Sequence, residues 1–207
     1  MMRHDLLNLI DRMTADEKAV SSSDSIPWHA HREAERLDDE SLLGELGEYL
    51  TKRHSKDKRM AAYFIIGKIG KNCRSPDCAS LLIAYTFEEK DKYALGSLLQ
   101  QLAGLPKPES IDIGPLFLLL KDERRLVRHA AINSLQGCES AEAEDKLLDV
   151  LASTTDHFDA VYCHAVLNRI GTPKSLPALA LNAESRKRDV KESARAAVAA
   201  IEVRDGG

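Results

Sequence analysis

Apolar residues recur along most of this chain with the three- and four-residue spacing of amphipathic helices. From Ser41 onward, long apolar segments alternate with short polar joints, and the strict alternation expected of half-buried strands is absent. The pattern predicts five pairs of helices. The first members are predicted at 41–53, 77–87, 112–121, 142–153 and 174–183, and the second members at 56–71, 89–103, 124–137, 157–170 and 187–202. The predicted fold class is therefore all-α.

The segment before Ser41 differs from this regular pattern. Residues 3–20 are predicted to form one or two short helices, and Thr14–Glu17 (TADE) fits a capping box. A further helix is predicted after the turn-prone SSSDSIP segment, with Ser25 as its N-cap. We therefore predict an N-terminal helical cap over residues 1–40 and a repeat array over residues 41–207 that forms a single continuous domain.

The five second helices align with one another. RMAAYFIIGKIG (59–70) matches RHAAINSLQGCE (128–139) and KESARAAVAAIE (191–202), while KYALGSLLQQLA (92–103) and AVYCHAVLNRIG (160–171) fill the other two places. One apolar position then recurs every 31 to 36 residues, at Ile69, Leu102, Cys138, Ile170 and Ile201. Two helices in each period of this length indicate a stacked helical repeat.

The joint LNRIGTPKSLPALA (167–180) indicates how one copy connects to the next. Ile170 is predicted to be buried, and Gly171 is predicted to take the left-handed conformation that ends a helix. Thr172 then caps the next helix; alternatively, Ser175 is the cap. An Ile170→Asp substitution is expected to cost roughly 3 kcal/mol or more, because it buries an unpaired charge.

Three segments resemble HEAT repeats of the phycobilisome-lyase type. IGKIGK (66–71), DERRLVRHAAINSL (122–135) and the joint at 167–180 carry parts of that family's pattern: an Asp before a Val-Arg pair, small residues, an apolar-Gly joint and a Leu-Pro-x-Leu entry. The resemblance covers about residues 41–203 and departs most at Leu102-Ala103, where the Gly joint is expected. It implies a right-handed α-solenoid (α-α superhelix) of about five HEAT-like pairs with a concave binding surface. It implies little about chemistry, because this fold serves scaffolds, lyase subunits, hydroxylases and DNA glycosylases.

A helical wheel places basic and aromatic side chains on the outward face of the second helices. The wheel that buries Val190, Ser193, Ala194, Ala197 and Ile201 turns Lys191 and Arg195 outward. The residues predicted to bind a partner on this concave face are Arg59, Tyr63, Lys92, Tyr93, Arg128, His129, His164, Lys191 and Arg195. Two interpretations stay open: a basic stripe that faces a ligand, or a structural surface whose cations pair with Asp57, Asp122 or Asp189.

No residue pattern points to catalysis or to a cofactor. The two histidines of WHAHRE lie about 200° apart on a helix, and Cys73 and Cys78 lack a second pair with zinc spacing. His129 and His164 can approach each other across adjacent repeats, but a polar surface is favoured over a metal site. Nucleophile motifs and phosphate-binding loops are absent. We therefore predict no catalytic residue, no metal site and no cofactor.

Charge and apolar content narrow the classes of partner. The formal net charge is −4, so bulk attraction to nucleic acid or to an anionic membrane is not expected. No stretch approaches the ~18 apolar residues of a membrane span, and the N-terminus lacks the apolar core of a secretory signal. The four cysteines have no paired spacing, which favours a reducing compartment. We expect a cytoplasmic protein with no membrane association.

These patterns predict a non-catalytic protein that binds another protein, through an acidic segment of that partner, in a partly basic groove. Such a protein is a scaffold, an adaptor, or an inhibitor of the immunity type. The alternatives are a HEAT-like DNA-binding protein or alkylpurine-DNA glycosylase-like enzyme, or a subunit of the bilin-lyase type. The acidic net charge, and the position of Trp28 outside the matched repeats, weigh against nucleic acid as the partner.

Overall fold

The computed structural model describes residues 4–16, 21 and 24–206. These residues form helices and connecting loops, as predicted, and apart from an isolated bridge between Lys107 and Cys138 they contain no β-structure. No helix in this part of the chain has the length and apolarity needed to cross a bilayer. The chain divides into two compact units, residues 1–106 (unit 1) and residues 107–207 (unit 2). The sequence placed a boundary at residue 40 instead, and a single continuous array over 41–207 stays a prediction.

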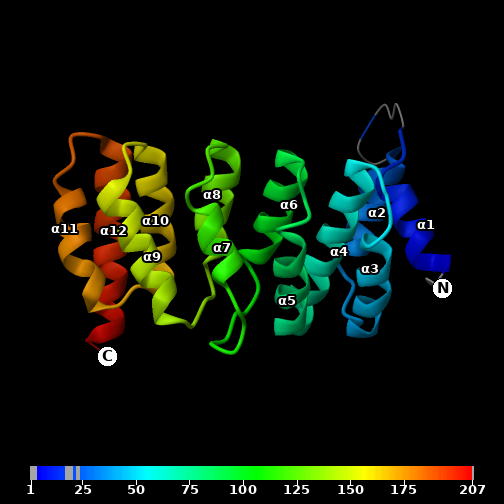
Figure 1. The fold of residues 1–207 in the computed structure, drawn as a ribbon, viewed down its shortest axis with the longest axis horizontal. Helices are drawn as coiled ribbons and strands as arrows, with labels where there is room; N and C mark the ends of the chain where they lie inside the picture. Colours follow the sequence, from blue (N-terminus) through cyan, green and yellow to red (C-terminus); the bar gives the residue numbers. More distant parts are fainter. Residues whose placement is uncertain (1–3, 17–20, 22–23, 207) are drawn as a thin grey trace. The chain divides into compact units, whose positions relative to one another are not determined.

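In unit 1, two N-terminal helices pack beside two helical pairs (Figure 1). The elements are α1 (His4–Met13), α2 (Ile26–Ala34), the 3-10 turn η2 (Glu40–Leu42), α3 (Leu43–Leu50), α4 (Lys56–Cys73), α5 (Pro76–Tyr85) and α6 (Lys92–Leu102). The long helix α4 contacts each of the other five helices. It approaches α5 closely because Gly70 has no side chain: a Cβ atom there would lie 2.6 Å from the Cβ atom of Cys78.

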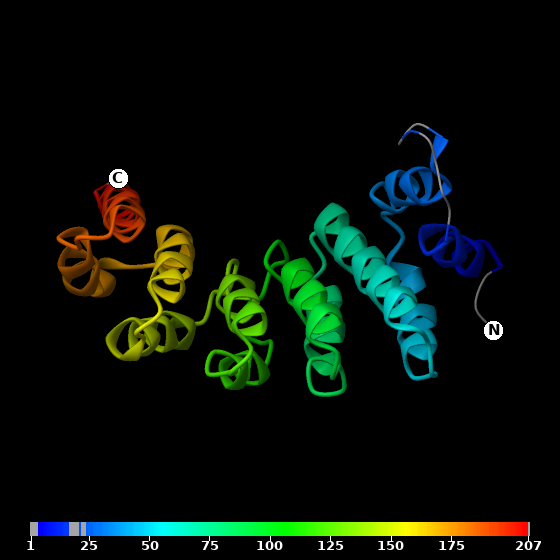
Figure 2. The same cartoon turned by 90° about the horizontal axis from the view of Figure 1, so that it is seen from above.

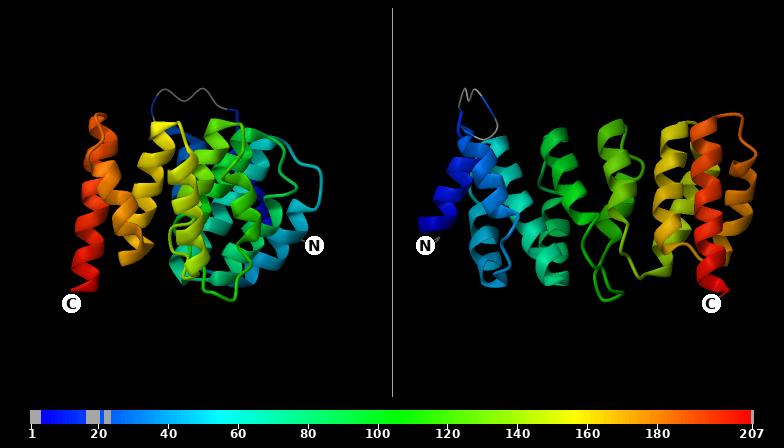
Figure 3. Two further views of the ribbon diagram at one scale, coloured as in Figure 1. Left: turned by 60° about the vertical axis from the view of Figure 1, so that its left-hand side comes forward. Right: turned by 180° about the vertical axis from the view of Figure 1, so that it is seen from behind.

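Unit 2 contains three helical pairs. The elements are α7 (Gly114–Leu119), α8 (Arg125–Ser134), α9 (Ala141–Ser153), α10 (His157–Ile170), the 3-10 turn η3 (Pro173–Ser175), α11 (Leu176–Ala183) and α12 (Arg188–Asp205). Within this unit, the second members α8, α10 and α12 form one layer and the first members α7, α9 and α11 form the other (Figure 2). Helices α10 and α12 lie side by side, as the right-hand view of Figure 3 shows. Each second member therefore packs against the next second member in the chain.

All ten helices predicted after Ser41 are present, with ends that differ from the prediction by a few residues. Local capping explains this agreement, because the side chains of Ser55, Asp91 and Asp156 accept hydrogen bonds from backbone N–H groups in the first turns of α4, α6 and α10. Ser25 caps α2 in the same way, as predicted. The predicted capping box at 14–17 extends outside the described residues; within them, Thr14 Oγ1 donates to the carbonyl of Ile10 over 3.0 Å.

The joint after α10 differs from its prediction at two residues. Gly171 has a φ of −64°, so the predicted left-handed conformation is wrong. A glycine fits there for steric reasons, since a Cβ atom would lie 2.5 Å from the carbonyl oxygen of Leu167. Ile170 is only half-buried, which makes its predicted burial wrong, because Val166 and Leu167 hold the core positions of this part of α10. The other four members of the recurring apolar position are buried.

Of the two caps proposed for this joint, the Thr172 side chain makes a capping hydrogen bond and the Ser175 side chain does not. Thr172 caps η3, and its side chain accepts a hydrogen bond from the backbone N–H of Lys174. Ser175 stands at the N-cap of α11, but its hydroxyl donates to the buried carboxylate of Glu144 over 2.5 Å. Glu144 also accepts the backbone N–H of Thr172 over 2.8 Å. A carboxylate on α9 therefore holds the start of the next helical pair.

Candidate functional site

The second helices α4, α6, α8, α10 and α12 contain all nine residues that the sequence predicted to bind a partner. Their side chains do not share one exposed face. Tyr63 is 1% exposed and His164 is fully buried, so the prediction that these two side chains face outward is wrong. The reason is their place on the helix, where they point toward the following second helix. The neighbouring helix fills the space that the helical wheel assigned to solvent.

In unit 1, Arg59 on α4 forms a bidentate ion pair with Glu89, just before α6. Arg59 Nε and Nη2 lie 2.7 and 2.8 Å from the two carboxylate oxygens, and Tyr63 Oη donates to the same carboxylate over 3.0 Å. Burial by itself raises the pKa of Glu89, but the hydrogen bonds from Arg59, from the backbone N–H of Asp91 and from Tyr63 together hold that pKa below its ordinary value. Arg59 also donates to the carbonyl of His54 over 2.9 Å. We call Arg59, Tyr63 and Glu89 the unit 1 cluster.

In unit 2, Arg128 on α8 makes the equivalent contact with Asp159 on α10. Arg128 Nε lies 2.9 and 3.0 Å from the two oxygens of Asp159, and Nη1 donates to the carbonyl of Asp122 over 2.9 Å. His129 Nε2 lies 3.0 Å from Asp159 Oδ1, and Asp156 pairs with both Arg128 and Arg125. We call Arg125, Arg128, His129, Asp156 and Asp159 the unit 2 cluster.

Five of the residues predicted to bind a partner are lysines or arginines, and two of these five form ion pairs within the protein. The structural interpretation of Arg59 and Arg128 as paired cations fits these contacts, although their partners are Glu89 and Asp159 rather than the aspartates expected from the sequence. Lys92, Tyr93 and Arg195 are exposed and Lys191 is half-buried. The ammonium groups of Lys56 and Lys92 lie 5.6 and 5.0 Å from the ring centroid of Tyr93, a cation–π arrangement.

The structure brings His164 on α10 and Ser193 on α12 together, which the sequence did not predict. His164 Nδ1 and Ser193 Oγ are 2.9 Å apart, and Ser193 Oγ donates to the carbonyl of Asp189 over 2.8 Å. Burial lowers the pKa of His164 to about 4. Such an imidazole is a poor general base, and the serine proton is already held by a carbonyl. This pair has a packing role rather than a catalytic one.

The unit 2 cluster also contains a set of metal-ligand atoms. His129, Asp156 and Asp159 place one ligand atom each within 4.8 Å of one another. The guanidinium of Arg128 bonds both carboxylates and supplies the positive charge that a cation would otherwise bring. Burial lowers the pKa of His129 below 6.5, even though Asp159 and Asp156 act in the opposite direction. The arrangement is an ion-pair network that joins α8 to α10.

The four cysteines are free thiols, and burial dominates the chemistry of three of them. It raises the pKa of Cys78 and of Cys138 to about 11, and it raises the pKa of Cys163 as well. A thiol is nucleophilic as the thiolate, so these three side chains are unreactive at neutral pH. Their role is to fill the core, as the sequence indicated for Cys163.

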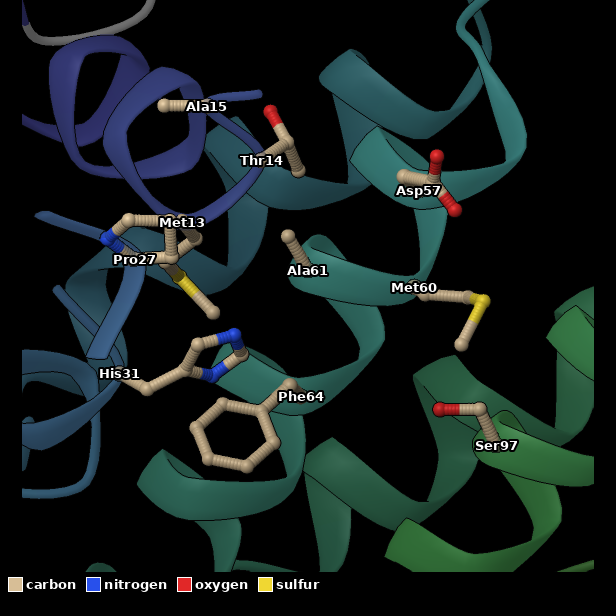
Figure 4. A pocket seen from close by; sticks show the side chains of 10 residues that line it. All are labelled: Met13, Thr14, Ala15, Pro27, His31, Asp57, Met60, Ala61, Phe64 and Ser97. Carbon is tan, nitrogen blue, oxygen red and sulfur yellow. The ribbon is translucent and has the colours of Figure 1, made fainter. Parts of the chain in front are cut away.

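An open cavity of about 340 Å³ lies along α4 in unit 1 (Figure 4). We call it the α4 groove. It is lined by Met13, Thr14, Ala15, Pro27, His31, Asp57, Met60, Ala61, Phe64 and Ser97. Figure 4 shows the residues of α4 along the floor, with Met13, Pro27 and His31 on one side and Ser97 of α6 on the other. The groove is at the lower end of the size range of ligand pockets, roughly 300–1,000 Å³.

Phe64 is the central aromatic side chain of this groove. The ring of His31 meets it edge-on, with centroids 5.0 Å apart, and the ammonium group of Lys68 lies 4.7 Å from its centroid. Burial lowers the pKa of His31 below 6.5, the acidic neighbour Glu35 opposes this, and the cations Arg32 and Lys68 add to it. The imidazole is therefore neutral at pH 7. The interior of the groove combines apolar atoms with an uncharged ring.

The helical wheel did not predict the α4 groove, because it placed toward solvent the residues one position before those that line the groove. The open side of α4 carries Asp57, Met60, Phe64 and Lys68, at i, i+3, i+7 and i+11, whereas the wheel chose the adjacent Arg59 and Tyr63. The available signal was the apolar pair Met60 and Phe64, which lies next to the fully buried arc of α4. That pair reads as core in the sequence, but both side chains are only half-buried.

Comparison with known proteins adds no family or relative. No protein-family model matches the chain, and no curated protein matches it. The likeness to HEAT repeats therefore rests on the motifs quoted above.

Proposed function

We propose that this protein binds another protein without catalysing a reaction, and that the α4 groove of unit 1 is a contact site. The observation that carries the proposal is the apolar floor of the groove. Met60 and Phe64 occupy an open cavity on a second helix, and Asp57 is the one ionised side chain among the described lining residues. Thioether and aromatic side chains in a concavity are typical of surfaces that receive a partner's apolar side chains.

We also propose that the chain forms a right-handed α-solenoid of HEAT-like pairs and that it acts as a scaffold, an adaptor or an inhibitor in the cytoplasm. It is supported by the repetition of one contact: Arg59 and Arg128 each join a second helix to the next and each donate to a carbonyl in the preceding loop. Stacked helical pairs of this kind present extended binding surfaces. The protein's role would be to supply shape and side-chain contacts.

A contact with an acidic segment of the partner is also part of the proposal. It concerns Lys92 and Tyr93 in unit 1, and Lys191 and Arg195 in unit 2. No ion pair joins Lys191 or Arg195 to another residue in the described part of the chain. These cations are therefore available to a carboxylate of a partner, at the modest energy typical of exposed pairs.

Affinity capture with matched variants tests the proposed function. The full chain, Phe64→Glu and the control Phe87→Glu are immobilised and exposed to native lysate, and the captured proteins are identified by mass spectrometry. Phe87 is 53% exposed and lies outside the α4 groove, so it controls for the added charge. A captured protein is then purified, and its affinity for the three chains is measured by calorimetry.

We expect the partner to bind the natural chain and Phe87→Glu equally and to lose at least tenfold in affinity for Phe64→Glu. Equal affinity for all three chains would move the site away from the groove. A salt-sensitive shift of duplex DNA would instead favour the nucleic acid alternative, for which Arg59 and Arg128 would have to leave their carboxylates. Turnover of a substrate that one substitution abolishes would contradict the non-catalytic role.

A further inference from the structure

Asp57, which lines the α4 groove, and Lys68, which lies just beyond Phe64, differ from Lys58 and Arg59 of the same helix. Asp57 is in the first turn of the helix and Lys68 is eleven residues later on the same face. Lys58 pairs with Asp11 over 2.6 Å, and Arg59 pairs with Glu89. By contrast, neither Asp57 nor Lys68 forms an ion pair with any residue in the ranges 4–16, 21 and 24–206. An acidic side chain thus lies at one end of the apolar floor, and a cation without an ion pair lies over Phe64 toward the other end.

The spacing of these charges matches one helix lying along another. Eleven residues of α-helix rise by about 16 Å, or three turns. Met60 and Phe64 lie between the two charges on the same face, and the walls from α2 and α6 confine an occupant to a path along α4 (Figure 4). Met13 and Met60 add flexible thioethers, which adjust to the shape of an incoming side chain. The groove therefore has the layout of a site for an amphipathic helix.

The order of the charges selects the direction of that helix. A free helix is stabilised by acidic side chains in its first turn and basic side chains in its last turn. If it lies antiparallel to α4, its acidic start meets Lys68 and its basic end meets Asp57. A parallel helix with an acidic first turn and a basic last turn would place like charges together at both ends. Electrostatics thus favour the antiparallel arrangement.

We infer that the α4 groove binds an amphipathic helix of a partner protein, antiparallel to α4. The helix has an acidic side chain in its first turn, apolar side chains over Met60 and Phe64, and a basic side chain about three turns after the acidic one. This inference rests on the proposed function and specifies the chemistry of the partner at this site.

The test uses a displayed library of 18-residue alanine-rich helical peptides. Positions 3, 6, 7, 10 and 14 are randomised, and the library is selected against the full chain, with Phe64→Glu used to remove peptides that bind elsewhere. We expect enriched peptides to carry Asp or Glu at position 3, apolar residues in the middle and Lys or Arg at position 14. No enrichment, or enrichment without this charge order, would overturn the inference.

A charge exchange provides the matched control. The best selected peptide and its isomer with positions 3 and 14 exchanged are measured by fluorescence anisotropy against the full chain and against Asp57→Lys/Lys68→Asp. We expect the natural chain to prefer the selected peptide by about tenfold, the double variant to prefer the isomer, and both preferences to shrink in 0.5 M NaCl. Identical preferences in the two chains would overturn the inference.

These results separate the inference from the proposed function. If a captured partner depends on Phe64 but the peptides show no acid-to-base order, the protein-binding function stands and the antiparallel helix is wrong. If the peptides follow the predicted order and lysate capture yields no partner that depends on Phe64, the groove binds helices and the proposed physiological role fails. Circular dichroism of each variant checks that the helical content is unchanged.

Discussion

Arg59 in unit 1 and Arg128 in unit 2 occupy the same place in their helical pairs. Each is near the start of a second helix, reaches a carboxylate 30 or 31 residues later, and also donates to a backbone carbonyl in the loop before its own helix. The surroundings differ. The side chain of Glu89 is 1% exposed and is bonded by Arg59, Tyr63 and a backbone N–H. Asp159 instead contacts Arg128, His129 and the Thr154 hydroxyl, and the neighbouring Asp156 pairs with both Arg125 and Arg128.

This difference shows how one contact between helices can be built with few or many partners. In unit 1 a single buried carboxylate depends on a single guanidinium for its charge balance. In unit 2 the charge is spread over two acids and two arginines, with His129 beside them. Removing one cation should therefore have unequal consequences, because a buried carboxylate left without a counter-charge is costly.

The largest effect is expected for Arg59→Ala, which should lower the free energy of unfolding by about 4 kcal/mol. Arg128→Ala should cost about half as much, because Arg125, His129 and Thr154 still contact the two aspartates. Urea denaturation at pH 7 measures both, and the fluorescence of Trp28, the single tryptophan, follows unit 1. Equal losses in the two variants would show that the additional partners in unit 2 do not compensate.

The next largest effect concerns acid pH and the buried His164 of unit 2. Folding lowers the pKa of His164 in unit 2 from 6.5 to about 4, so the unfolded chain binds the proton more readily between these values. The stability associated with a neutral His164 is complete above about pH 6.5 and decreases as the pH falls toward about 4, by roughly 3 kcal/mol. Denaturation between pH 7 and pH 4 measures this dependence.

His164→Gln serves as the control for the pH effect, because an amide does not titrate. We expect the variant to lose stability at pH 7 but to show a flatter dependence between pH 6.5 and pH 4. Glu89 in unit 1, whose pKa is lowered, should destabilise the protein only as the pH falls below the ordinary carboxyl value of 4.5. An unchanged pH profile in His164→Gln would assign the early acid transition to another group.

The smallest effect is expected for Tyr63→Phe, which removes one of the donors to Glu89 and keeps the ring. The loss should be about 1.5 kcal/mol, because Arg59 and the backbone N–H of Asp91 still bond the carboxylate. Thermal and urea denaturation are precise enough to detect it. A loss as large as that of Arg59→Ala would mean that the hydroxyl and the guanidinium act as one unit, which the double variant Arg59→Ala/Tyr63→Phe would reveal.

The sequence by itself determined the all-helical fold and the positions of the helices. Capping side chains such as Ser25, Ser55 and Asp156 act within one turn, and the apolar period is readable over ten to eighteen residues. These are local effects, so ten helices could be placed from Ser41 onward. The burial of Val190, Ala194, Ala197 and Ile201 followed from the same period, whereas Ser193, predicted in the same arc, is only half-buried.

Only the tertiary structure decided which side chains of those helices meet solvent. Arg59, Tyr63 and His164 look like surface residues because they are polar, but their partners are about 30 residues away, in the next second helix or in the loop just before it. Conversely, Met60 and Phe64 look like core residues, yet both side chains are only half-buried and line the α4 groove. A helical wheel gives the angle of each side chain about the axis of the helix that carries it. It does not give the positions of neighbouring helices, and those positions determine which polar groups are paired and which apolar groups stay open.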